Sequence, residues 1–286
     1  MLSRDFREFV TLLNAHAADD LIVGGVTRIF LASLSSLLLA LSAAPQAFAA
    51  DQIIRLETRP GVKVPVFYMK RDGATATVVL LPGGNGGFGA VVDGKPSSAN
   101  FLVRTRDLFA AAGFNVAVMG RPSDTNDLDY ADRVSANHVH DLKQLVDHFK
   151  ADSGLPVWLV GTSRGTVSAT AAAVKFGNAD LAGVVLTSSV VSYKKVGAVP
   201  TQDLAAIKIP VLVLHHEEDG CKICAPHEVP GILKGLKNAP IKRLRMVNGG
   251  GNPTGDPCEA LHYHGYSGME QEAVTLITEW IRKPAN

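Results

Sequence analysis

A single serine stands between two glycines in the sequence Gly-Thr-Ser-Arg-Gly at positions 161–165. An apolar run at 157–160 precedes this segment, and a stretch of small residues suited to a helix follows it at 166–176. A serine in this setting is typical of a nucleophile elbow, a strand-to-helix turn so tight that larger flanking residues would clash. The turn lifts the hydroxyl above the edge of the sheet. We therefore predict that Ser163 is a nucleophile.

A nucleophilic serine needs a base to take its proton and a carboxylate to orient that base. In parallel α/β sheets such groups lie on loops at the carboxyl ends of strands. An acidic cluster follows the apolar run 211–214, and two histidines precede the last predicted helix. We expect Asp219 to be the acid, because a reverse turn is expected there, and His264 to be the base, because it precedes a glycine close to that helix.

Other residues compete for these roles and stay open on sequence grounds. They are Glu217, Glu218 and Asp256 for the acid and His262 for the base. His215 and His216 are interpreted as structural loop residues beneath the site, and His138, His140 and His148 as surface or packing residues of a helix at 133–150. The two His-x-His pairs lack acidic or cysteine companions at ligand spacing, so we expect no metal and no cofactor.

The order Ser163, Asp219, His264 resembles that of the α/β-hydrolase family, as do the segments 156–166 and 264–266, within a similarity that spans roughly 53–282. The resemblance implies hydrolysis of an ester, thioester or amide through an acyl-enzyme. The short lid region favours a small or flexible acyl substrate. We expect a carboxylesterase. A thioesterase or peptidase on the same fold, or a non-catalytic binding protein, are the alternatives.

The same resemblance implies two backbone donors for the oxyanion of the tetrahedral intermediate. One is the N–H of Arg164, the residue after the nucleophile. The other is expected from the glycine-rich loop after the strand at 76–81, at Gly84 or Asn85. The family often begins this loop with His-Gly, whereas this chain has Pro82-Gly83, so the second donor is the less securely placed of the two.

The elements that must position these groups alternate between strands and helices. Strands are predicted at 53–58, 64–70, 76–81, 115–119, 157–160, 181–186, 211–215 and 241–247, and helices at 100–112, 133–150, 165–176, 232–236 and 270–281. This alternation predicts an α/β fold with a mostly parallel central sheet, helices on both faces and an antiparallel N-terminal hairpin at one edge. The connection after 186 is too short for a lid domain, so we expect an open, shallow site.

Three cysteines lie in the C-terminal third, Cys221, Cys224 and Cys258. A bridge between Cys221 and Cys258 would tie the acid loop to the base loop, and this is the pairing we expect. Cys221 and Cys224 also form a C-x-x-C, but no second such pair is present for zinc and the motif does not open a helix after a first strand. Cys224 is expected to be a buried free thiol.

The first 50 residues are interpreted as an N-terminal extension and a signal peptide, and 51–286 as the hydrolase domain. The apolar run 29–43 and the Ala-Phe-Ala-Ala at 47–50 are typical of a secretory signal, which predicts a periplasmic or extracellular protein; an uncleaved anchor is the alternative. The acidic residues before position 28 suit a signal poorly, unless translation starts near Val23 or Val26. A net charge of +1 and the lack of basic runs argue against nucleic-acid and anionic-membrane partners, and leave the oligomeric state open.

The segment 84–89 also has the form G-x-G-x-x-G after a strand, with Arg121 after the next strand in place for a 2′-phosphate. A dinucleotide site would need a helix that starts at these glycines and an acidic residue about 20 positions further on. The sequence provides neither. An exported protein would also have little access to nicotinamide cofactors, so we disfavour this interpretation.

Overall fold

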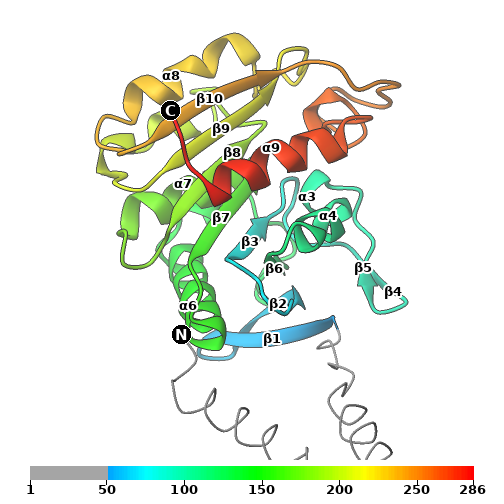
Figure 1. Cartoon of the computed structure of the whole chain (residues 1–286), viewed down its shortest axis with the longest axis vertical. Helices are drawn as coiled ribbons and strands as arrows, with labels where there is room; N and C mark the ends of the chain where they lie inside the picture. Colours follow the sequence, from blue (N-terminus) through cyan, green and yellow to red (C-terminus); the bar gives the residue numbers. More distant parts are fainter. Residues whose placement is uncertain (1–50) are drawn as a thin grey trace, which may run out of the picture. The chain divides into compact units, whose positions relative to one another are not determined.

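An eight-stranded sheet runs through the computed structural model, which describes residues 51–286 (Figure 1). The strand order is β1-β2-β6-β3-β7-β8-β9-β10. β1 (Gln52–Arg59) and β2 (Val62–Met69) form an antiparallel hairpin at one edge, and β2 pairs antiparallel with β6 (Asn115–Met119). The remaining pairs are parallel and involve β3 (Thr77–Leu81), β7 (Val157–Thr162), β8 (Gly183–Thr187), β9 (Val211–His216) and β10 (Lys242–Val247). The expected sheet architecture is confirmed.

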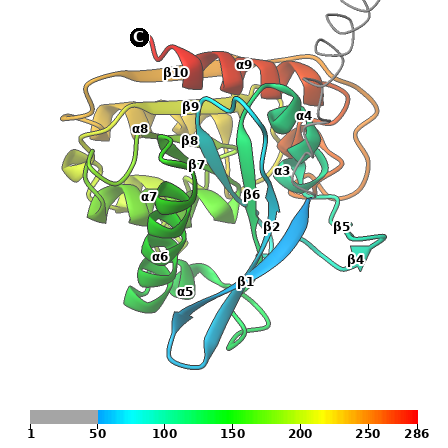
Figure 2. The same cartoon turned by 60° about the horizontal axis from the view of Figure 1, so that its bottom comes forward.

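Helices cover both faces of this sheet, so its central strands are buried along their whole length (Figure 2). One face packs against α6 (Ala136–Ser153), α7 (Arg164–Lys175) and α8 (Pro230–Gly235). The other packs against α3 (Phe101–Arg104), α4 (Arg106–Ala111) and α9 (Glu270–Arg282). One buried apolar cluster lies on each face of the sheet, and together they position the strand ends from which the loops of the site extend.

Two predicted helices are each divided in the structure, so their predicted extents were wrong. The helix expected at 100–112 breaks at Thr105, whose hydroxyl donates to the Phe101 carbonyl at 2.7 Å. The helix expected at 133–150 is α5 (Tyr130–Val134) followed by α6, and Ser135 between them accepts a hydrogen bond from the His138 N–H. Both breaks occur where a hydroxyl side chain competes for backbone hydrogen bonds.

The connections near the site are short. The segment between β3 and α3 contains a small hairpin, β4 (Val91–Val92) and β5 (Lys95–Pro96), which the sequence did not indicate. Between β8 and β9 the chain makes two 3₁₀ turns, η1 (Val199–Thr201) and η2 (Leu204–Ala206). No lid domain therefore interrupts the sheet within residues 51–286.

The predicted signal run at 29–43, the alternative start sites and the cleavage positions lie outside the described residues. Within the described part of the chain, no helix is both long and apolar enough to cross a membrane.

Candidate active site

Ser163 lies at the junction between β7 and α7, with φ 51° and ψ −126°. A non-glycine residue in this region is strained, and it persists only where the surroundings enforce it. They do so here through close packing: a Cβ atom at Gly161 would lie 2.5 Å from the Gly165 carbonyl oxygen, and one at Gly165 would lie 2.0 Å from that of Leu81. The two glycines are thus required by the turn, as the sequence motif indicates.

The structure brings His264 to Asp219, 45 residues apart in the chain. The Nδ1 atom of His264 lies 2.8 Å from Oδ2 of Asp219, and both side chains are buried. The other ring nitrogen, Nε2, has no hydrogen-bond partner among the residues described, and His264 lines the same pocket as Ser163. The imidazole is therefore held at Nδ1, while its buried Nε2 makes no hydrogen bond within the described chain, Ser163 included.

The carboxylate of Asp219 is kept ionised although it is buried. Burial by itself would raise the pKa of Asp219, but hydrogen bonds with His215 and His264 outweigh this effect and lower the pKa to about 2. A charged Asp219 favours the His264 tautomer that carries its proton on Nδ1 and leaves Nε2 as the acceptor.

The competing residues are placed elsewhere. Glu217, Glu218 and Asp256 are exposed. Within the described chain, none of the three forms a side-chain hydrogen bond with His262 or His264. His262 is half-buried, packs edge-on against Tyr263 and does not line the pocket.

His215 corrects one interpretation made from the sequence. Both His215 and His216 are the last residues of β9 rather than loop residues, and both are buried. The Nε2 atom of His215 lies 3.4 Å from Asp219 Oδ2 and 2.8 Å from the Cys224 carbonyl oxygen. His215 thus contacts the same Asp219 oxygen as His264, a contact that only the folded loop after β9 reveals.

The base loop is fixed by backbone contacts around His264. The Ser188 hydroxyl donates to the His264 carbonyl at 2.7 Å, and the Tyr266 hydroxyl donates to the Leu214 carbonyl at 2.8 Å. A Cβ atom at Gly265 would lie 1.9 Å from the Ala260 carbonyl oxygen, which explains the glycine after the histidine. The imidazole is therefore anchored through its own main chain to the ends of β8 and β9.

The glycine-rich loop passes close to Ser163. A Cβ atom at Gly83 would lie 2.8 Å from the Cβ of Ser163. Neither Gly84 nor Asn85 donates its N–H to any residue of the described chain. Arg164 is the first residue of α7, where a helix leaves its N–H unpaired. The candidates for the two predicted oxyanion donors, Arg164 and either Gly84 or Asn85, thus belong to the two segments that flank Ser163.

Arg133, a residue that the sequence did not single out, lies beneath this loop and is fully buried. Its Nη2 atom donates to the carbonyls of Pro82 and Gly84, both at 3.3 Å, and its Nη1 atom donates to the Ser168 hydroxyl at 3.0 Å. Burial and repulsion from Arg164 lower the pKa of Arg133 to about 9, so it remains a cation at neutral pH. It forms no ion pair with any described carboxylate.

Because a peptide unit is planar and trans, holding its oxygen also aims its N–H in the opposite direction. Four consecutive carbonyl oxygens of the loop accept hydrogen bonds. Those of Pro82 and Gly84 accept from Arg133, that of Gly83 accepts from the Gly86 N–H, and that of Asn85 accepts from the Leu128 N–H. The donors of the loop are therefore oriented before any substrate arrives, the arrangement that electrostatic catalysis requires.

The same buried cluster explains His138, which was expected only as a surface or packing residue. Its Nε2 lies 2.9 Å from the Ser168 hydroxyl, which also accepts from Arg133. Burial, with repulsion from Arg133, lowers the pKa of His138 to about 3, so the ring is neutral and accepts the Ser168 proton.

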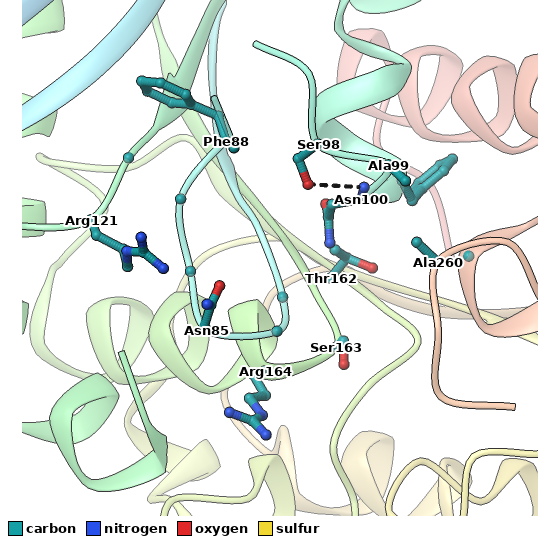
Figure 3. Close-up of a pocket in the computed structure, with 18 of the residues that line it drawn as sticks. Asn85, Phe88, Ser98, Ala99, Asn100, Arg121, Thr162, Ser163, Arg164 and Ala260 are labelled. Carbon is teal, nitrogen blue, oxygen red and sulfur yellow. Dashed lines mark hydrogen bonds between the residues drawn. The ribbon is translucent and has the colours of Figure 1, made fainter. Parts of the chain in front are cut away.

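These groups open onto a pocket of about 910 Å³ (Figure 3). Its walls come from the glycine loop, the start of α3, the segment after β6 and the loop that carries His264. Figure 3 shows Asn85 and Arg121 on one side of Ser163 and Ala260 on the other. The glycine loop leads to the β4–β5 hairpin and no helix begins at its glycines, so the structure offers no support for the dinucleotide interpretation.

A disulfide joins Cys221 to Cys258, the pairing expected from the sequence, and Cys224 is a buried free thiol. The Cys221 N–H donates to Asp219 Oδ1 at 2.9 Å, so the bridge links the residues around Asp219 to the loop that carries His264. Burial, with the negative Asp219 nearby, raises the pKa of Cys224 well above its usual range. Cys221, Cys224 and His264 place potential metal-ligand atoms within 4.8 Å of one another, but the Cys221 sulfur is already bonded in the disulfide.

No protein-family model matches the chain, and no curated protein matches its sequence. Solved structures do match its fold. A dienelactone hydrolase from Anabaena variabilis is 16% identical, with 83% of this chain and 100% of that chain covered at a TM-score of 0.57. A soluble variant of monoglyceride lipase from Saccharomyces cerevisiae is 12% identical. The match covers 85% of this chain and 99% of that chain at a TM-score of 0.56. An α/β serine hydrolase without a lid from Xanthomonas campestris is 17% identical. The match covers 84% of this chain and 100% of that chain at a TM-score of 0.51.

The strand order, the connections and these similarities define the class: the chain has the α/β-hydrolase fold. At these identities the likeness extends to the fold alone. The chemistry must be argued from the site of this chain.

Proposed function

We propose that the protein is a serine hydrolase that cleaves an ester-type bond through an acyl-enzyme, as a carboxylesterase. The observation that carries the proposal is the 2.8 Å contact between His264 Nδ1 and Asp219 Oδ2. It leaves the buried Nε2 of His264 without a partner in the described chain, and His264 and Ser163 line the same pocket. A strained serine, an oriented imidazole and a buried carboxylate are the three kinds of group that a catalytic triad needs, and this supports the proposal.

In the proposed reaction, His264 Nε2 takes the hydroxyl proton while Ser163 Oγ attacks the carbonyl carbon. The carbonyl oxygen becomes an oxyanion, which accepts hydrogen bonds from the N–H of Arg164 and from that of Gly84 or Asn85. His264 then gives its proton to the leaving alkoxide and the acyl-enzyme forms. A water molecule, deprotonated by His264, attacks the acyl carbon, and collapse of the second intermediate releases the acid and restores Ser163.

Asp219 stabilises the imidazolium formed in both half-reactions without itself taking the proton. Its low pKa supports this role, because a carboxyl group with a pKa of about 2 stays ionised throughout the neutral range. The short β8–β9 connection and the open pocket favour small acyl substrates. The disulfide is compatible with an exported protein, which agrees with the proposed periplasmic or extracellular location.

The experiment is a comparison of p-nitrophenyl esters of increasing acyl length with a matched thioester and a matched anilide. The proposal predicts measurable kcat/KM for the short esters, slower turnover of the anilide, and loss of at least about 10³-fold activity in S163A. Faster turnover of the thioester or the anilide would assign the site to a thioesterase or a peptidase. No turnover of any substrate by the folded protein would leave a non-catalytic binding role.

A further inference from the structure

We propose that Arg121 forms an anion subsite in this pocket, so that the preferred substrate is an ester that also carries a carboxylate. The inference rests on the proposed function, because it names the substrate class of the same site. Its basis is a guanidinium group at the pocket wall that no carboxylate in residues 51–286 pairs with.

The stem of Arg121 is held in place by the glycine loop. Arg121 follows Gly120 at the end of β6 and lines the pocket together with Ser163 and His264. A Cβ atom at Gly86 or at Gly87 would lie 3.3 Å from the Cγ of Arg121, so these two glycines make room for the stem. In Figure 3 the side chain extends from its strand end toward this loop and Asn85.

The segment after Arg121 is rich in aspartates, yet none of them neutralises it. Asp124 pairs with Arg59 at 2.8 Å, Asp127 lies 3.8 Å from Arg164, and Asp129 and Asp132 form the capping box of α5. Arg121 forms no ion pair and donates no side-chain hydrogen bond to any residue in 51–286. The acids nearest in sequence are thus engaged by other groups.

Arg121 is exceptional among the arginines of the described domain. Only Arg55, Arg121 and Arg245 in this part of the chain lack both a carboxylate and a carbonyl partner, and of these Arg55 and Arg245 are exposed whereas Arg121 is half-buried. A guanidinium presents N–H donors in a planar fork that matches the two oxygens of a carboxylate. A half-buried fork that faces a pocket and has no partner among the described residues suits a ligand of that chemistry.

The remaining charges of the pocket agree with this assignment. Arg164, the other lining arginine, faces Asp127 and stacks over the Tyr130 ring at 4.8 Å. The lining carboxylate is Glu259, an exposed residue on the segment that also carries Ala260, on the other side of Ser163 from Arg121 in Figure 3. The charge is therefore positive at the Arg121 side of the nucleophile, where a substrate carboxylate would bind.

The test compares mono-p-nitrophenyl glutarate with p-nitrophenyl valerate, two esters with five-carbon acyl groups that differ in a terminal carboxylate. We expect the wild-type ratio of their kcat/KM values to favour the glutarate ester by about 10- to 100-fold, the range of a charge-assisted hydrogen-bonded pair. R121Q should bring this ratio close to one, chiefly through KM, and R121K should give an intermediate ratio. R245Q, which removes an exposed and equally unpaired arginine, is the matched control and should keep the wild-type ratio. Added salt should lower the wild-type preference.

A wild-type ratio near one, or a preference that survives in R121Q, would overturn the subsite while leaving the hydrolase intact. Failure of the proposed function gives a different result, since neither ester would then be cleaved by the folded protein. In that case calorimetric titration with glutarate decides the subsite: binding that is weakened in R121Q supports it, and equal or absent binding in both proteins refutes it. If R121Q does not fold, R121K and the salt dependence of glutarate binding by the wild type provide the same decision.

Discussion

Asp219 and His264 contact each other at 2.8 Å from loops that a disulfide also joins, through Cys221 and Cys258. The Cys221 N–H donates to the Asp219 oxygen that His264 does not contact. The orientation of the proposed base is therefore set by three linked features: the carboxylate, the main chain next to it and a covalent bridge between the two loops.

Replacing the acid tests the orientation of the base. D219N keeps the shape of the side chain but places an amide where His264 Nδ1 donates, so the imidazole is expected to lose its productive tautomer. We predict a fall in kcat of about 10³- to 10⁴-fold with little change in KM. Steady-state kinetics, with far-UV circular dichroism to confirm folding, measures this effect. A variant that folds and retains more than a tenth of the wild-type kcat would contradict the role of Asp219.

The same residue predicts how stability depends on pH. The pKa of Asp219 is about 2 in the folded protein against 3.8 for a free side chain, so the unfolded state binds the proton more readily. The stabilisation is therefore complete above about pH 5 and is lost as the pH falls from about 5 through the folded pKa of about 2. We expect wild-type unfolding free energy to fall by about 2 kcal/mol more than that of D219N across this window. Urea unfolding at a series of pH values checks this, and parallel curves for the two proteins would contradict it.

Removing the disulfide tests whether it supports the site as well as the fold. The bridge closes a separation of 37 residues, so C221S/C258S is expected to lose about 2 to 4 kcal/mol of unfolding free energy. Activity should fall by at least about tenfold under conditions where the variant stays folded, because both loops carry site residues. The control is C224A, which removes a buried thiol outside the bridge. Full activity in the folded double variant would show that the bridge serves the fold alone.

Arg133 is expected to act on the transition state through the glycine loop. R133M leaves the Pro82 and Gly84 carbonyls without their donor, so we predict a fall in kcat of about 10- to 100-fold with KM nearly unchanged. Binding of a boronic acid, which forms a tetrahedral anionic adduct with the serine, should weaken by a similar factor. R106M removes another buried arginine, one that donates to the Val103 carbonyl away from the pocket, and provides the matched control.

The two variants separate positioning from stability. If both lose stability but only R133M loses affinity for the boronic acid, Arg133 positions the oxyanion donors. Equal affinity for the boronic acid in R133M and R106M would show that Arg133 contributes only to stability and does not position the oxyanion donors.

The sequence predicted those features that leave a local pattern. The glycines beside Ser163 mark the elbow, the apolar runs mark the strands, and chain order places Asp219 and His264 on loops at the carboxyl ends of strands. The confirmed sheet architecture follows from the same patterns, because strands buried on both faces are apolar throughout.

Long-range contacts leave no such pattern. Arg133 stands in a short polar helix, and nothing near it in the chain shows that it lies beneath a loop some 50 residues earlier. The sequence around His215 does not indicate its contact with Asp219, because that contact depends on the conformation of the turn after β9. At Thr105 the side-chain hydroxyl and the backbone N–H both donate to the Phe101 carbonyl, a local detail that the apolar pattern of the segment does not show.

The most direct measurement of the central claim is labelling with a fluorophosphonate probe followed by peptide mass mapping. The account predicts a single adduct on Ser163 in the wild type, none in S163A, and labelling of H264A slowed by at least about 100-fold. An adduct on another residue, or no adduct on folded wild-type protein, would contradict the proposal that Ser163 is a nucleophile activated by His264.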